Sequence, residues 1–284
     1  MHLGNVFSAL LSWLSVKSRG GRWLLRIEDI DAARSRPEFV SMLMDDLQWL
    51  GLSWDGEPVY QSRRSDIYAH YFRELQSQGL TYPCYCTRAD LLAVQAPHES
   101  DGRVVYPGTC RGLPPQEGRS AAVRLIVPDE EVSYVDGHYG LQAANLSRHV
   151  GDFVIRRKDG AWAYQLAVVA DDALTGVTEV VRGRDLLLSA LQQRYVARCL
   201  GFAPPAFTHF PLLLGASGQR LSKRDLSLDM QSLRQRYTPC ALLGLLAHLA
   251  GLLPVAQPVT PAQLLEVFSW EKVPLADISA AKYA

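Results

Sequence analysis

The chain has 284 residues, with 29 lysines and arginines against 29 aspartates and glutamates, so its formal net charge is zero. Apolar residues make up 48% and charged residues 20%, which excludes a disordered chain and gives no overall electrostatic attraction to nucleic acid. No apolar run reaches the roughly 20 residues of a membrane span, and no secretory signal precedes the first apolar stretch. Five cysteines, an odd number, favour thiols or a metal over disulfides. We therefore expect a cytoplasmic globular protein without membrane attachment.

The first part of the chain alternates helices with a short strand. Apolar residues at helical spacing predict helices over 6–16, 38–50 and 67–78, and a mostly apolar run predicts a strand over 23–27. This alternation is typical of the α/β class, in which helices cover a sheet.

Residues 83–150 differ in character, because prolines and glycines cluster there and short β-like runs such as 122–127 appear. The α/β pattern resumes with apolar runs at 153–155 and 164–170. We expect these four regions: the first half of an α/β domain (1–82), an inserted subdomain (83–150), the second half of the domain (151–214) and a helical C-terminal region (215–284).

The second half adds a predicted strand over 176–181 and a predicted helix over 186–200. Beyond it, the apolar stretch 241–253 contains His248 and is too short to span a membrane, so it predicts a buried helix.

His2-Leu3-Gly4-Asn5 opens the first predicted helix. The N-terminus of a helix offers free N–H groups and a positive dipole, and glycine lets a phosphate approach the backbone. An imidazole there could donate to phosphate oxygens as charge develops. The alternative is an ordinary helix cap.

A second polar stretch, residues 218–224, follows the apolar segment 210–214. A glycine-flanked loop with Lys223 near its centre could cover a triphosphate and neutralise a departing pyrophosphate. The alternative is a solvated basic loop.

Taken together, residues 2–5 and 221–224 resemble the paired signatures of the class I aminoacyl-tRNA synthetases. The residues between them, up to about residue 226, resemble the glutamyl branch, and the matching segments follow one another in the same order as in that family. The matching segments are Leu25–Asp31 with Arg34-Ser35, Trp49–Asp55, Gln61-Ser62 with Tyr68, Cys84 with Cys86, and Val181–Leu186.

The resemblance implies a Rossmann-like class I synthetase catalytic domain, with an inserted zinc-bearing acceptor-type subdomain and a short helical C-terminal region. It implies activation of L-glutamate as an adenylate, with ATP and Mg²⁺ as substrate. His2, Gly4, Asn5 and Lys223 fall on the ATP-binding positions, with His2 and Lys223 as the catalytic ones. Arg220 occupies the loop's first lysine position, which keeps the charge but not the ammonium geometry.

The resemblance also implies a glutamate pocket. Glu28 matches the carboxylate that takes the α-ammonium group, and Tyr164 and Arg182 match the other two positions. An arginine is apt because its planar fork pairs with a carboxylate. The alternatives are a strand end for Glu28, core packing for Tyr164 and a structural ion pair for Arg182.

Cys84, Cys86 and Cys110 resemble three ligands of a structural zinc ion, which needs a fourth donor. Tyr106 matches the tyrosine of the shorter glutamyl-type enzymes, while His98 and His138 are the conventional alternatives. Buried free thiols are the competing interpretation.

Only 61 residues follow Lys223, too few for the anticodon-binding region of full-length glutamyl-tRNA synthetases. The chain therefore resembles the glutamyl-Q tRNA(Asp) synthetases, a family expected to be monomeric. The resemblance implies glutamate transfer to queuosine in the anticodon loop of tRNA(Asp). The basic residues that could contact phosphates are Arg220, Lys223, Arg224, Arg234, Arg236 and 156–158.

One departure concerns the start. The family carries a strand and turn ahead of the first ATP motif, whereas only Met1 precedes His2. We expect a start assigned too far downstream, or a fragment. Two other functions stay open: a truncated or discrete glutamyl-tRNA synthetase that charges the 3′ end of tRNA(Glu), and a catalytically degenerate RNA-binding paralogue.

Overall fold

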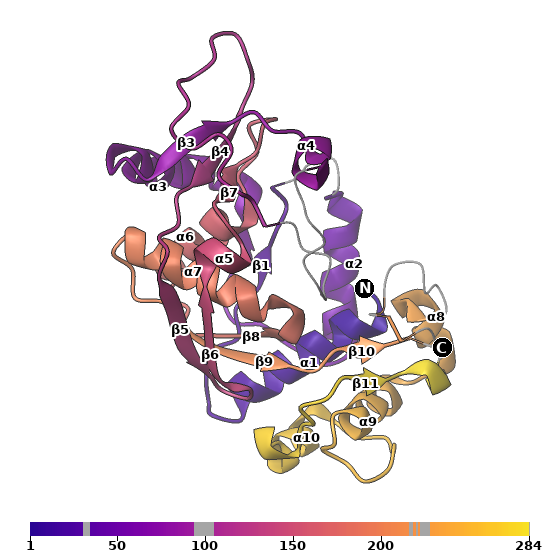
Figure 1. Ribbon diagram of the computed structural model, residues 1–284. Coiled ribbons are helices and arrows are strands. Elements are labelled where there is room, and N and C mark those ends of the chain that lie inside the picture. The colour runs from indigo at the N-terminus through magenta and orange to yellow at the C-terminus, as the bar shows by residue number, and fades with distance from the viewer. Residues whose placement is uncertain (31–34, 94–104, 216–217, 220, 222–227, 284) are drawn as a thin grey trace.

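The computed structural model describes residues 1–30, 35–93, 105–215, 218–219, 221 and 228–283 (Figure 1). The helices are α1 (Leu3–Lys17), α2 (Pro37–Trp49), α3 (Ser65–Ser77), α4 (Arg88–Ala93), α5 (Leu146–His149), α6 (Tyr164–Thr175), α7 (Leu187–Cys199), α8 (Met230–Arg236), α9 (Pro239–Leu249) and α10 (Pro261–Val267). The strands are β1 (Arg26–Ile27), β2 (Val59–Tyr60), β3 (Thr81–Cys84), β4 (Ala122–Leu125), β5 (Glu131–Asp136), β6 (Gly140–Asn145), β7 (Phe153–Arg156), β8 (Glu179–Gly183), β9 (Ala206–Phe210), β10 (Leu213–Leu214) and β11 (Ile278–Ser279).

The predicted helices are confirmed as α1, α2, α3 and α7, and the predicted buried helix is α9, so the α/β class is confirmed. The strand expected over 23–27 is shorter than predicted. The Trp23 N–H donates to the Asp55 carboxylate at 2.6 Å, and the Asp55 N–H donates to the Trp23 carbonyl at 2.8 Å. Because these backbone groups are engaged by a loop residue, ladder pairing begins only at Arg26.

The described strands form small separate sheets. Parallel pairs join β1 to β2, β8 to β9 and β10 to β11, while β3, β4 and β7 form an antiparallel sheet and β5 and β6 a hairpin. A groove of about 760 Å³ is lined by residues 21–26 on one side and 176–181 on the other. The edges of β1 and β8 therefore border the same open space.

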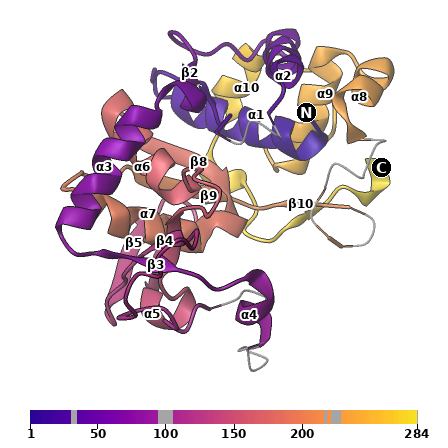
Figure 2. The ribbon, with the colours of Figure 1, turned by 90° about the horizontal axis from the view of Figure 1, so that it is seen from above.

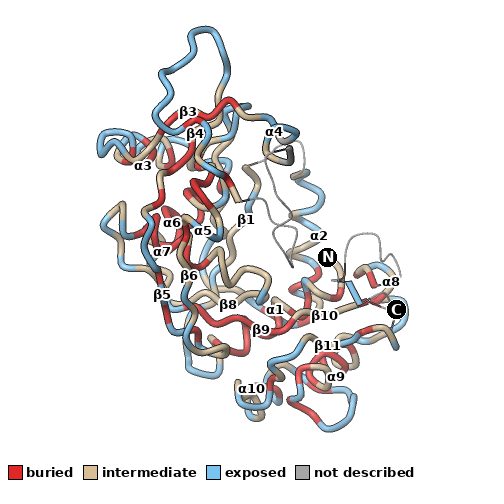
Figure 3. Tube along the Cα trace, in the orientation of Figure 1, coloured by how far each residue is buried: buried red, intermediate tan, exposed pale blue. Residues whose placement is uncertain are grey.

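The largest core is built around α1. Its apolar residues recur at helical spacing, so one face packs against the C-terminal helices. Of these, α9 and α10 lie below α1 in Figure 1 and beside it in Figure 2, and α8 lies to its right. Phe7 meets Phe210 of β9 edge to face, with ring centroids 5.8 Å apart. Figure 3 shows buried backbone along both α1 and α9. This packing fixes the N-terminus of α1 against the last third of the chain.

The β5–β6 hairpin covers a second core. Along β5 exposed and buried residues alternate, so Val132, Tyr134 and Asp136 face inward while Val135 is exposed. The Tyr134 ring lies 5.6 Å from the Phe207 ring of β9. Asp136, at the end of the strand, is thereby carried into the interior.

No helix within the described ranges is both long and apolar enough to cross a membrane.

Candidate active site

The first ATP motif lies at the N-terminus of α1. His2 is the N-cap residue with extended backbone, and its N–H donates to the Asn5 side-chain oxygen at 3.1 Å. A Cβ added to Gly4 would lie 3.1 Å from His2 Cε1 and 3.2 Å from His2 Nδ1. The imidazole therefore lies against Gly4 at the helix start, where an added Cβ would force the ring to shift.

Leu221 of the second motif and the segment that follows the loop meet the same helix end. The Leu221 side chain is 3% exposed and belongs to the core that contains Leu3. On the other flank, His2 forms an antiparallel bridge with Asp229, and the Met230 N–H donates to the Met1 carbonyl at 2.9 Å.

The predicted loop residues themselves, Arg220, Lys223 and Arg224, lie outside the described residues. The structure thus brings Leu221 of the second signature, and the segment that follows the loop, against residues of the first signature.

The three predicted glutamate-pocket residues also converge. Tyr164 begins α6 and Arg182 lies near the end of β8, and Arg182 Nη1 donates to the Tyr164 hydroxyl at 3.4 Å. Glu28 directly follows β1 and is exposed. Tyr164 is exposed at the surface, yet desolvation by its neighbours raises its pKa, an effect that Arg182 opposes and Glu28 reinforces. The acid, the hydroxyl and the arginine therefore interact electrostatically at the carboxyl ends of β1 and β8, where open α/β sheets bind ligands.

Arg182 is held by groups from three further elements. Its Nε donates to His209 Nε2 at 3.1 Å, its Nη1 to Gln193 Oε1 at 2.8 Å and its Nη2 to the Leu186 carbonyl at 3.3 Å. Since a guanidinium only donates, the Gln193 atom that faces it is the amide oxygen. Gln193 also lies close enough to Tyr164 to oppose the rise in the pKa of that hydroxyl.

Sequence reasoning missed His209 and Gln193. His209 lies among the aromatic residues of β9, a run that is typical of a buried strand, and Gln193 is one polar residue of an otherwise ordinary helix. Only the register that pairs Arg182 with His209 reveals the contact, and strand register cannot be read from one sequence.

Two residues that carried the resemblance have a structural role. Gln61 Nε2 and the Tyr68 hydroxyl each donate to Asp171 Oδ2 at 2.8 Å, and Arg64 Nε donates to Asp171 Oδ1 at 2.6 Å. The Asp171 side chain is fully buried, so these bonds compensate for its lost hydration. They fix α6, and with it Tyr164, against α3.

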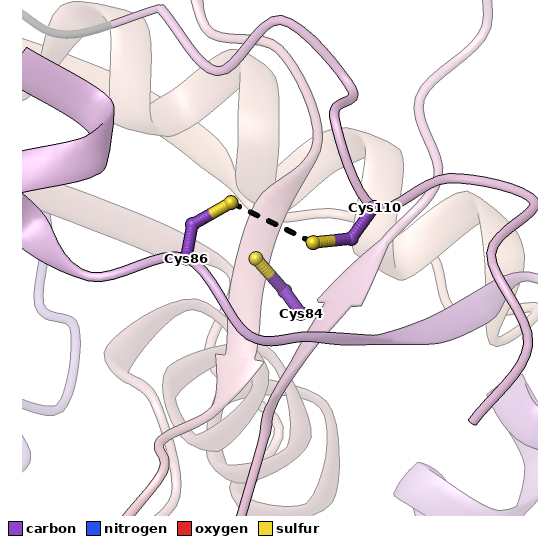
Figure 4. Close-up of side chains that lie close together, drawn as sticks. All are labelled: Cys84, Cys86 and Cys110. Carbon is purple, nitrogen blue, oxygen red and sulfur yellow. Dashed lines mark hydrogen bonds between the residues drawn. The ribbon is translucent and has the colours of Figure 1, made fainter. Parts of the chain in front are cut away.

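The three cysteines form a cluster in which the Sγ atoms of Cys84, Cys86 and Cys110 lie within 4.8 Å of one another (Figure 4). The Tyr106 hydroxyl is 3.5 Å from Cys84 Sγ and accepts a hydrogen bond from the Cys110 N–H at 2.8 Å. Hydrogen bonds from the Tyr85 backbone, Tyr106 and the other two cysteines outweigh the effect of burial, and the pKa of Cys110 falls to about 7.

The other candidates for a fourth ligand do not join this cluster. The His138 ring bonds to the Pro274 carbonyl at 3.3 Å and packs near Trp270. His98 lies outside the described residues. Among the described donors, the Tyr106 oxygen is therefore the one placed beside the thiols.

One predicted phosphate contact is engaged elsewhere. Arg234 forms ion pairs with Asp45 and Asp46, at 2.7 and 2.8 Å. Its charge is therefore partly neutralised by α2.

Comparisons with known proteins agree with this geometry. The family model described as tRNA synthetases class I (E and Q), catalytic domain, matches residues 1–258. Proteins named glutamyl-Q tRNA(Asp) synthetase are 45% identical in Symbiobacterium thermophilum, 45% in Nitratidesulfovibrio vulgaris and 43% in Neisseria meningitidis. These alignments each cover 96% of this chain, and 90%, 90% and 93% of the three relatives.

Two solved structures share the fold over the whole chain. One is a glutamate tRNA ligase from Elizabethkingia meningosepticum in complex with its amino acid, with a TM-score of 0.82. The other is the glutamate-tRNA synthetase of Elizabethkingia anophelis, with a TM-score of 0.83. Both are 26% identical, and the chain spans 65% and 66% of their lengths.

Proposed function

Since the chain belongs to the glutamyl-Q tRNA(Asp) synthetases, a branch of the class I tRNA synthetases, we propose that it activates L-glutamate with ATP in the absence of tRNA. It then transfers the glutamyl group to queuosine at the wobble position of tRNA(Asp). The observation that carries this proposal is the convergence of Glu28, Tyr164 and Arg182. The acid is suited to an α-ammonium group and the guanidinium to a side-chain carboxylate, so the pair matches the two ends of glutamate.

In the first step the glutamate α-carboxylate attacks the α-phosphorus of ATP, and the bond to pyrophosphate breaks, leaving glutamyl-adenylate. His2 donates to the phosphate oxygens as charge develops, and Gly4 leaves the start of α1 open to the nucleotide, while the Asn5 N–H already donates to the His2 carbonyl at 2.8 Å. Lys223, two residues beyond the anchored Leu221, neutralises the departing pyrophosphate. Mg²⁺ accompanies ATP as its counter-ion.

In the second step a hydroxyl of the queuosine diol attacks the glutamyl carbonyl, AMP leaves, and the hydroxyl proton passes to solvent. The catalytic pocket itself faces the anticodon loop, with basic residues near 218–224 supplying phosphate contacts. The enzyme works as a monomer in the cytoplasm.

The cysteine cluster fits a structural zinc ion held by Cys84, Cys86, Cys110 and Tyr106. Tetrahedral zinc with bonds of about 2.3 Å to sulfur needs thiolates roughly 3.8 Å apart, and the three Sγ atoms already lie within 4.8 Å. Burial raises the pKa of Tyr106, so its phenolate would form only beside a cation. When bound, the ion joins the end of β3 to residues 106–110 and thereby stiffens the inserted subdomain proposed for 83–150.

Pyrophosphate exchange without tRNA tests the first step. Exchange that depends on glutamate supports the proposal. Its absence, together with retained tRNA binding, would instead favour a degenerate RNA-binding paralogue.

Acceptor assays test the second step, with queuosine-containing tRNA(Asp) compared against tRNA(Glu). Glutamate should be accepted by tRNA(Asp) even after the 3′ CCA end is removed. Charging of tRNA(Glu) that is lost with the CCA end would instead identify a discrete glutamyl-tRNA synthetase.

A further inference from the structure

The guanidinium of Arg182 is oriented by an imidazole that must act as an acceptor. Arg182 and His209 are direct partners in the parallel β8–β9 ladder, and Arg182 Nε donates to His209 Nε2 at 3.1 Å. Because a guanidinium has no lone pair to offer, this contact requires an unprotonated Nε2 on His209. The ring must then carry its proton on Nδ1.

A buried carboxylate fixes that tautomer. His209 Nδ1 lies 2.5 Å from Asp136 Oδ2, and neither side chain is exposed to solvent. Asp136 belongs to the β5–β6 hairpin, whereas His209 lies on β9. One carboxylate from the 83–150 region, Asp136, thus reaches His209 of the α/β domain, although nothing in the adenylate chemistry described above uses either residue.

The orientation of the carboxylate is also determined. Its Oδ1 accepts backbone N–H groups from His138 and Tyr139, each at 3.0 Å, and from His209 at 3.2 Å. These bonds occupy Oδ1, so Oδ2 is the atom left for the ring. Burial alone would raise the pKa of Asp136, but the ring and the backbone donors outweigh burial and hold it below its usual range.

We propose that Asp136 and His209 are positioning residues that aim Arg182 at the side-chain carboxylate of glutamate by fixing the Nδ1–H tautomer of His209. This inference rests on the proposed function, in which Arg182 binds glutamate. Neither residue touches the substrate. Their effect is to hold the Nε–H of Arg182, which together with the bonds to Gln193 and Leu186 fixes the plane of the guanidinium before glutamate arrives.

The Asp136→Asn variant tests the tautomer without changing shape. The backbone donors continue to require the amide oxygen at the Oδ1 position, so the NH₂ group is turned toward His209 Nδ1. The ring must then accept at Nδ1 and carry its proton on Nε2, where it meets the Arg182 Nε–H, a donor against a donor.

Two substitutions at position 209 form a matched pair. His209→Gln places an amide oxygen near the position of Nε2, so it can still accept from Arg182. His209→Asn keeps a donor near the position of Nδ1 for Asp136 but loses the acceptor. The two variants therefore separate the contact with Arg182 from the contact with Asp136.

Tautomer and kinetics are measured on the whole chain. We expect Asp136→Asn and His209→Asn to raise the KM for glutamate in pyrophosphate exchange roughly 10- to 100-fold, the value of a hydrogen bond to a charged group. The KM for ATP should not change, and His209→Gln should stay within about threefold of the unmodified chain. The ¹⁵N shifts of the His209 ring should report Nδ1–H in the unmodified chain and Nε2–H in Asp136→Asn.

The outcomes separate the two claims. If neither the unmodified chain nor one extended upstream by the family's strand and turn exchanges pyrophosphate with glutamate, the proposed function is refuted, and the ring shifts then decide the tautomer alone. Three results would each overturn the positioning role. The first is an Nε2–H ring in the unmodified chain, and the second is an unchanged KM for glutamate in Asp136→Asn. The third is an equal rise in the KM for glutamate in His209→Gln and His209→Asn. Melting temperatures identify any variant that loses activity by unfolding. If Asp136→Asn unfolds, the ring shifts of the unmodified chain and the comparison of His209→Gln with His209→Asn still judge the proposal.

Discussion

Replacing Gly4 by alanine should separate stability from activity at the start of α1. The new Cβ would lie 3.1 Å from His2 Cε1, whereas carbon contacts are comfortable at about 3.5–4.0 Å. The imidazole would therefore have to retreat by roughly 0.5 Å. Since a misplacement of about 1 Å can reduce a rate 100-fold, we expect kcat for pyrophosphate exchange to fall on the order of 10-fold.

Stability should move the other way or stay constant. Alanine is favoured over glycine in a helix interior by about 1 kcal/mol, and by less in the first turn. For a chain of this size that corresponds to a rise in Tm of about 2 °C or less.

The assay is exchange kinetics beside thermal melting, for Gly4→Ala, His2→Asn and the double variant. In the His2→Asn background the shorter side chain leaves room, so Gly4→Ala should have little further effect. Full activity in Gly4→Ala would refute the steric argument. An equal loss with and without His2 would show that the effect acts through another group.

Three further predictions concern the pocket, the cysteine cluster and the groove. Glu28→Gln should raise the KM for glutamate about 10-fold or more, because it removes the charge that meets the α-ammonium group. The control is Glu266→Gln, at an exposed position. An equal KM for glutamate in both variants would contradict the role of Glu28. Elemental analysis should find zinc in the control variant Cys240→Ser but not in Cys86→Ser. Zinc retained in both variants would exclude Cys86 as a ligand. A chain extended upstream by the family's strand and turn should melt higher and exchange faster, because a strand in the groove between β1 and β8 would pair both edges. Identical melting and exchange in the two chains would remove the groove as the place of that strand.

The helices could be predicted because their apolar spacing is unambiguous, as for α1, in which Val6, Leu10 and Leu14 lie on one buried face. The apolar run 164–170 was harder to interpret, since a short run of this kind suits a strand or a helix. The structure makes it the first turns of α6.

Site residues could be predicted where they belong to a local sequence motif, but not where only a tertiary contact brings them together. Glu28, Tyr164 and Arg182 could be named because motifs carry them in a fixed order, and the structure brings them together. Asp136 and His209 lie 73 residues apart. Their contact depends on the inward face of a hairpin and on a parallel register, neither of which leaves a local pattern.

The burial of Leu221 and Leu228 restricts the segment between them, which contains Lys223. Leu221 and Leu228 are both buried in the core around α1, so the six residues between them begin and end at fixed points. The entropic cost of closing a loop grows with the logarithm of its length. Here the packing of the two leucine side chains compensates for most of that cost when the chain folds. Under the proposed function, Lys223 is therefore an intramolecular partner of the triphosphate, with the high effective concentration that such a partner has. The two apolar anchors then limit where that lysine can act.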